Sequence, residues 1–240
     1  MARRLEPRNR LETRRSLRTP RAAAVAGIIF ALLLIAALVL LELSAPPDPA
    51  QAGEWLTNST RRAAVAVALN LIPFAGIAFL WFIGVVRDRI GGREDRFFIT
   101  VFLGSGLLFT GMLFVAAAVA GGLIAAASRT SGLPGPGTLA LGRNATSILL
   151  NVYCLRMAAV FTLTTVTIGR RTEVIPRWLG IGGLITTLVL LIGTGISAWA
   201  ALLFPAWILA LSIDILLAGQ QAVPAAAAAP RPPDGGPGDG

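Results

Sequence analysis

Long apolar runs separated by short polar segments dominate the pattern of this chain. Six of these runs reach roughly the 20 residues that a helix needs to cross a hydrocarbon core of about 30 Å. They predict transmembrane helices over residues 22–41, 63–86, 97–127, 146–168, 178–199 and 201–218. The expected fold is therefore an all-α membrane protein, a six-transmembrane-helix bundle within residues 22–218.

Two polar segments flank the predicted membrane domain. Residues 1–21 form a basic arm, which we expect to attract anionic lipid headgroups. Residues 219–240 are rich in Ala, Pro and Gly. This tail lacks the apolar periodicity needed to pack, so it is predicted to be disordered.

The positions of the arginines predict the orientation, because short loops rich in positive charge stay in the cytoplasm. The loops and ends that share a side with the amino terminus carry 16 arginines, and the opposite loops carry 4. Both termini are therefore predicted to be cytoplasmic. Trp178, Trp199 and Trp207 flank the last two spans, where an interfacial aromatic belt would hold them.

The first apolar run has an alternative interpretation as a signal peptide that is removed after export. Its basic flank and the sequence Ala50-Gln51-Ala52 fit that reading. Removal would leave five spans and an external amino terminus. The run is longer than a typical signal core and is followed by Pro46 and Pro47, which favours an uncleaved anchor.

Composition narrows the possible chemistry. The chain is 55% hydrophobic and 14% charged, with a mean hydropathy of +0.73, which argues against a soluble domain. The absence of histidine excludes imidazole proton relays, histidine metal sites and Ser-His or Cys-His nucleophile pairs. Cys154 is the single cysteine and is predicted to be an inert packing residue. We expect no cofactor, no metal, no enzymatic activity and no nucleic-acid partner.

Arg156 is the one basic residue predicted to lie deep within a span. Only 12 residues precede it from Asn144 and 13 follow it to Gly169, so the span lengths place it within a few Å of the midplane. Asp214 is the one acid predicted well inside a span, at a depth that the arginine stem can reach. We therefore predict an Arg156 to Asp214 pair, in a buried polar centre that also holds Asn151 and Tyr153.

Three roles stay open for that pair: to hold two helices together, to bind a substrate or ion, or to make no direct contact. The fourth span carries polar residues on two faces, which predicts a central position for it in the bundle. In the second span, Asn70 and Pro73 predict a helix kink or a ligand contact, with the amide bonded to a carbonyl that the proline frees. Glycines of the third and fifth spans predict close helix approach.

The segment from Gly84 to Arg93 resembles the loop signature of major facilitator carriers, with Gly84, Asp88, Arg89 and Gly91 at the matching positions. The resemblance implies a half-carrier that dimerises, because those carriers have twelve spans. Two further signatures of that family are missing from this chain. The alternative is a solvated charged loop without a special role.

A broader resemblance covers the last two spans. Ile175-Pro176-Arg177-Trp178-Leu179-Gly180 and Phe204-Pro205-Ala206-Trp207 are similar to segments of uncharacterised actinobacterial multi-pass membrane proteins. That resemblance implies a bacterial plasma membrane and no particular activity. The sequence as a whole favours a non-catalytic accessory or assembly subunit that binds a membrane protein or a second copy of itself; the alternative is a small-solute or ion transporter or channel.

Overall fold

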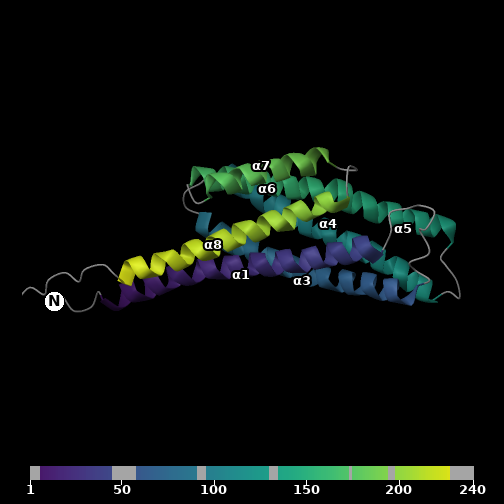
Figure 1. Ribbon diagram of the computed structural model, residues 1–240, viewed down its shortest axis with the longest axis horizontal. Coiled ribbons are helices and arrows are strands. Elements are labelled where there is room, and N and C mark those ends of the chain that lie inside the picture. Colours follow the sequence, from purple (N-terminus) through teal and green to yellow (C-terminus); the bar gives the residue numbers. More distant parts are fainter. Residues whose placement is uncertain are drawn as a thin grey trace, which may run out of the picture.

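The computed structural model describes residues 6–44, 58–90, 96–129, 135–172, 175–193 and 198–227. All regular structure within these ranges is helical. The elements in chain order are α1 (Glu6–Ser44), α3 (Ser59–Ile90), α4 (Arg96–Arg129), α5 (Pro136–Ile148), the π-helical turn η2 (Leu149–Cys154), α6 (Leu155–Arg171), α7 (Arg177–Ile192), the 3-10 helix η3 (Ala198–Leu202) and α8 (Leu203–Ala227). The backbone runs from α5 through η2 into α6 without a break, so these three elements form one long rod (Figure 1).

Five helical segments are long and apolar enough to cross a membrane. They are Ala22–Ser44, Ser59–Arg87, Phe97–Ala127, Gly137–Arg171 and Trp199–Ala218. The segment predicted as the fifth span is represented by α7, an apolar helix of only 16 residues. The all-helical architecture is thus confirmed for the described residues, while six crossings remain a prediction.

The boundaries differ most at the carboxyl end and in the fourth span. Helix α8 continues to Ala227, so the beginning of the segment predicted to be disordered is helical, and residues 228–240 lie outside the described residues. The fourth apolar segment begins at Gly137, about two and a half helical turns before residue 146, where the fourth span was predicted to start. The additional residues belong to α5, in which Asn144 and Ser147 are exposed.

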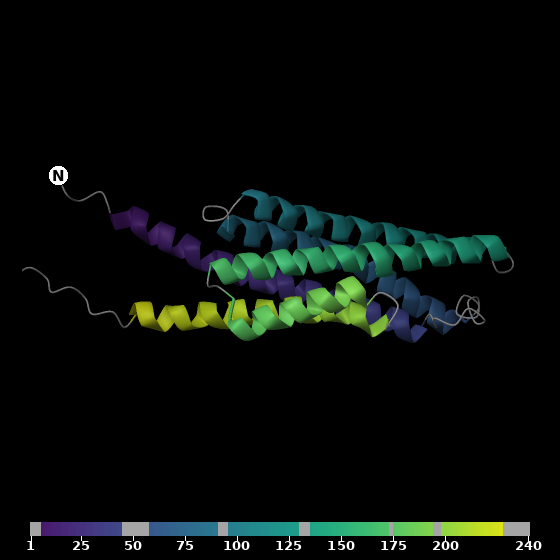
Figure 2. The same ribbon diagram turned by 90° about the horizontal axis from the view of Figure 1, so that it is seen from above.

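The helices form a closed ring. Each helix packs against the next, in the order α1, α3, α4, α6, α7 and α8, and α8 packs back against α1. Figures 1 and 2 show these helices running side by side along one long axis. The prediction of a central fourth span is therefore wrong, because α6 is one member of the ring and side chains fill the space inside it.

The two ends of the ring differ in charge. Helix α1 begins and α8 ends at the same end of the molecule (Figure 2), where α3 and α6 also end and α4 and α7 begin. We call this the arginine-rich end, since Arg87, Arg170, Arg171 and Arg177 lie there. The end formed by α5, the start of α3 and the finish of α4 is called the opposite end.

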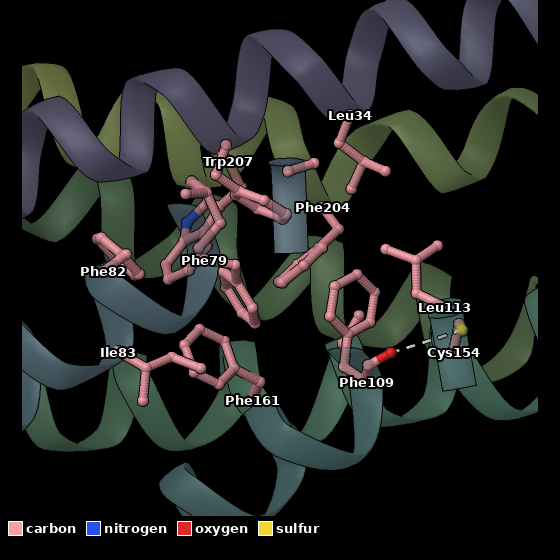
Figure 3. Packing of buried hydrophobic residues seen from close by; sticks show 14 of the residues in the cluster. Leu34, Phe79, Phe82, Ile83, Phe109, Leu113, Cys154, Phe161, Phe204 and Trp207 are labelled. Carbon is pink, nitrogen blue, oxygen red and sulfur yellow. Dashed lines mark hydrogen bonds between the residues drawn. The ribbon is translucent and has the colours of Figure 1, made fainter. Parts of the chain in front are cut away.

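A set of phenylalanines fills the centre of the ring. We call it the phenylalanine layer, and it consists of Phe30, Phe79, Phe109, Phe161 and Phe204, from five different helices. Each is 0–4% exposed, and ring centroids lie from 4.4 Å apart for Phe30 and Phe79 to 6.4 Å for Phe30 and Phe109. Four of them, with the neighbouring Trp207, are labelled in Figure 3.

Small residues allow close packing at some of the predicted positions. A Cβ on Gly106 would lie 2.5 Å from Ile83, and a Cβ on Gly183 would lie 2.9 Å from the indole of Trp207. No such neighbour lies within 4 Å at Gly104, Gly111 or Gly182. Close approach through glycine is therefore a property of individual positions in these helices and not of the whole glycine pattern.

Candidate functional site

The neighbourhood of Arg156 has an unusual backbone. The π-helical turn from Leu149 to Cys154 ends two residues before it, within a rod that is otherwise α-helical. Single π turns are rare inside α-helices and are frequent at functional sites. Arg156 itself is half-buried, so its side chain is neither enclosed in the core nor fully open.

The Arg156 side chain extends toward the opposite end of the bundle. Its Nη1 donates a hydrogen bond of 3.2 Å to the carbonyl oxygen of Val152, one turn earlier in the rod. This direction agrees with the general tilt of helical side chains toward the amino terminus of their helix. The rod begins at the opposite end, so the guanidinium is displaced toward that end.

Arg156 also lies on the outer face of the ring. Tyr153, Arg156, Val160, Leu163 and Thr167 follow one another at spacings of three or four residues, and all are exposed or half-buried. Residues at this spacing share one face of a helix. The buried face holds Cys154, Ala158, Phe161, Thr162 and Thr165. Arg156 therefore faces away from the phenylalanine layer.

The positions of Arg156 and Asp214 along the bundle axis keep them apart. Arg156 precedes Phe161 by five residues, which places it about 7–8 Å from the phenylalanine layer toward the opposite end. Asp214 follows Phe204 by ten residues, about 15 Å from the same layer toward the arginine-rich end. The axial separation of roughly 22 Å exceeds the reach of both side chains. The structure does not bring this predicted pair together.

The other members of the predicted polar centre lie at the surface. Tyr153 is 52% exposed, and the side-chain amide of exposed Asn151 donates to Ser147 Oγ at 3.2 Å, one turn away. The threonines of α6 bond to their own helix, each donating at 2.6–2.8 Å to the carbonyl four residues earlier. These polar groups are thus satisfied locally and do not gather in the middle of the bundle.

Asn70 and Pro73 lie on exposed positions of α3. The Asn70 amide donates to the carbonyl oxygen of Ala66 at 2.8 Å. Pro73 removes the donor that would bond to Leu69. The amide therefore serves a different carbonyl from the one that the proline frees, and the predicted link between the two residues is not formed.

Residues of the carrier-like signature fall largely within a helix. Helix α3 continues to Ile90, so Gly84, Asp88 and Arg89 have helical backbone. A Cβ on Gly84 would have no neighbour within 4 Å, which fits its exposed position. Gly91 lies outside the described residues.

Three polar contacts between helices escaped sequence reasoning. The indole Nε1 of Trp207 donates to the carbonyl oxygen of Leu179 at 3.1 Å, so this tryptophan is buried and not interfacial as predicted. Thr187 Oγ1 donates to the carbonyl oxygen of Ala159 at 3.5 Å. The Cys154 thiol lies 3.8 Å from the carbonyl oxygen of Phe109 (Figure 3). Each contact joins two neighbouring elements of the ring. Such contacts depend on how the helices are aligned along the bundle axis, and the hydrophobic periodicity of one helix does not show this alignment.

No group of three or more His, Cys, Asp or Glu side chains suited to a metal ion occurs among the described residues. Comparison of the chain with protein-family models, with curated proteins and with solved structures found no significant match. A function for this protein is therefore inferred from the geometry of the bundle.

Proposed function

We propose that this chain is a multi-pass plasma-membrane protein that acts as a non-catalytic accessory or assembly subunit. The phenylalanine layer carries the proposal. Five aromatic side chains that are 0–4% exposed occupy the centre of the ring, where a transport pathway through one copy would have to run. Polar groups of α6 bond to their own backbone, which leaves them unsuited to coordinate a passing solute.

The proposed topology has six crossings with both termini in the cytoplasm. Helix α7 spans about 24 Å, a length that covers most of a hydrocarbon core of about 30 Å. The positive-inside rule then assigns the arginine-rich end to the cytoplasm. A fluorescent protein that matures only in the cytoplasm, fused after Gly240, should fluoresce. Lack of fluorescence from a stable, membrane-inserted fusion would contradict the topology.

Cys154 supplies a native test of whether the centre is dry. Its thiol is buried beside Phe109, so we expect no reaction with a small aqueous maleimide in intact membranes and full reaction in sodium dodecyl sulfate. A Ser147→Cys variant in which Cys154 is replaced by serine is the matched control, since Ser147 is exposed on α5, and it should take up one equivalent of maleimide in both conditions. Reaction of Cys154 at a rate like that of the control would overturn the proposal.

The partner is tested by isolation of the tagged chain from its native membrane in mild detergent. An accessory subunit should copurify with one membrane protein, or as a homo-oligomer, at fixed stoichiometry. A monomer alone in every mild detergent tried would contradict the assembly role even if Cys154 is protected.

The π-helical turn beside Arg156 favours a second candidate, a small-solute or ion transporter. In that case Arg156 would line a water-filled route between copies of an oligomer, because it lies on the outer face of one ring. Such a route requires water at the outer face of α6. A cysteine at Val160, with Cys154 replaced by serine, should then react with the aqueous maleimide, whereas the accessory role predicts protection by lipid.

A further inference from the structure

Polar residues lie at matched distances on both sides of the phenylalanine layer. Toward the arginine-rich end, Arg87, Arg170 and Asp214 follow their helix's layer residue by eight, nine and ten positions, or about 12–15 Å. Toward the opposite end, Asn70 and Asn151 precede theirs by nine and ten positions, or about 14–15 Å. The two polar boundaries are therefore roughly 26–30 Å apart, close to the thickness of a hydrocarbon core.

This spacing places the phenylalanine layer near the middle of the bilayer and not Arg156. Arg156 lies about 7–8 Å from the layer and a similar distance below the boundary marked by Asn151. An arginine stem covers most of such a distance when its charged group rises toward the headgroups. The bond from Nη1 to the Val152 carbonyl, one turn nearer that boundary, gives the side chain this direction.

The lateral position agrees with the depth. Arg156 shares the outer face of the rod with Tyr153 of η2, which is 52% exposed, and with exposed Leu163 of α6. Leucine on that face suits contact with acyl chains, and a tyrosine near the boundary suits the interface. The guanidinium is thus presented to the leaflet at the opposite end of the bundle.

We propose that Arg156 binds the phosphodiester group of a phospholipid in that leaflet. A guanidinium has five N–H donors in a planar fork that matches two phosphate oxygens, and the bond to Val152 uses one of them. The phosphodiester is the anionic group that the common glycerophospholipids carry next to the glycerol, just outside the acyl chains. The half-buried Arg156 side chain binds it at the edge of α6, next to the π-helical turn.

Native mass spectrometry of the full chain, titrated with phosphatidylglycerol in detergent, tests the site. We expect Arg156→Gln to weaken the tightest lipid binding by about tenfold and Arg156→Lys by less, because lysine keeps the charge but not the fork. Arg61→Gln removes the same charge at the same end of the bundle, on the exposed first turn of α3, and should change the affinity by less than about twofold. Equal affinities for the wild type and Arg156→Gln would overturn the proposal.

Two further arms separate the possible ligands. Inorganic phosphate in large excess should not displace the lipid; displacement would identify a free-anion site instead. The affinity for phosphatidylcholine, which has the same phosphodiester, should also fall when Arg156 is replaced by glutamine. If Arg156→Gln abolishes copurification of a protein partner but leaves the lipid affinity unchanged, Arg156 contacts that protein and not a lipid.

Depth is measured independently with a nitroxide label on Arg156→Cys, with Cys154 replaced by serine, from its collisions with oxygen and with a polar nickel chelate. The labelled position should lie about halfway between the midplane and the hydrocarbon boundary of its leaflet, and a label on Ser147→Cys, also with Cys154 replaced by serine, should lie beyond the hydrocarbon. A label at the midplane would overturn the proposed site. Neither result depends on whether the protein has a partner, so this proposal and the accessory role fail separately.

Discussion

The indole Nε1–H of Trp207 donates a hydrogen bond to the carbonyl oxygen of Leu179, and the 3.1 Å contact joins α8 to α7. Both residues are buried. The indole can approach because Gly183, one turn after Leu179, has no side chain; a Cβ there would lie 2.9 Å from the indole nitrogen. Sequence positions 28 residues apart are thereby held in one packed contact.

Replacement of Trp207 should separate the contribution of the hydrogen bond from that of packing. Trp207→Phe removes the donor but keeps much of the ring, so we expect a loss of about 1 kcal/mol of unfolding free energy. Trp207→Ala also leaves a cavity and should cost about 3 kcal/mol or more. Unfolding by sodium dodecyl sulfate in mixed micelles measures both. Equal losses would mean that the indole contributes through the hydrogen bond alone.

Gly183 and Gly182 form a matched pair for the close approach of α7. Gly183→Ala forces the new methyl group against Val166 and Trp207, whereas Gly182 has open space. We expect Gly183→Ala to cost about 1–3 kcal/mol and Gly182→Ala to be neutral or slightly stabilising. The same unfolding assay checks this. A similar effect of both changes would point to the helical backbone and not to packing.

A second close contact joins α1 to α8 at Gly27 and Ser212. The Ser212 hydroxyl is buried without a hydrogen-bond partner among the described residues, and it would meet a Cβ on Gly27. Gly27→Ala should therefore destabilise, while Ser212→Ala should be close to neutral because it removes an unsatisfied polar group. The double variant should recover part of the loss, with a coupling of about 0.5 kcal/mol or more. Strict additivity would contradict the contact.

Arg156 and Asp214 should behave as independent residues. Their positions differ by roughly 22 Å along the bundle, so the effects of Arg156→Ala and Asp214→Ala on unfolding free energy should add within about 0.5 kcal/mol. The double-mutant cycle gives the coupling directly. A coupling well above that value would require the two side chains to meet.

The sequence pattern was sufficient to predict the helices, but it did not show how far each helix is shifted along the bundle axis relative to its neighbours. The third span, predicted over 97–127, corresponds closely to α4 at Arg96–Arg129, because a continuous apolar run has clear ends. The predicted contact between Arg156 and Asp214 is not formed, for a different reason. The rod that contains Arg156 is longer than a bilayer is thick, and only the packing of its Phe161 against Phe79 and Phe204 shows which part of the rod lies level with the centre.

The same limit applies to the side chains that fill the centre. Phe30 and Phe79 belong to apolar runs in which nearly every position is hydrophobic, so periodicity gives little indication of which face is buried. Trp207 showed the opposite problem, since a tryptophan near a predicted span end suggested an interface. The partner carbonyl of Leu179 belongs to another helix and leaves no mark in the local sequence.

The contact between α1 and α8 has a consequence for biogenesis. As the chain is synthesised, α1 enters the membrane long before α8, which covers it in the folded bundle. Phe30 therefore lacks its contact with Phe204 until α8 has been made. During that interval the ring lacks α8, and the phenylalanine layer is exposed to lipid or to the insertion machinery. A nascent chain arrested before Leu203 should therefore remain sensitive to proteolysis, and it should become resistant only when α8 has been released from the ribosome.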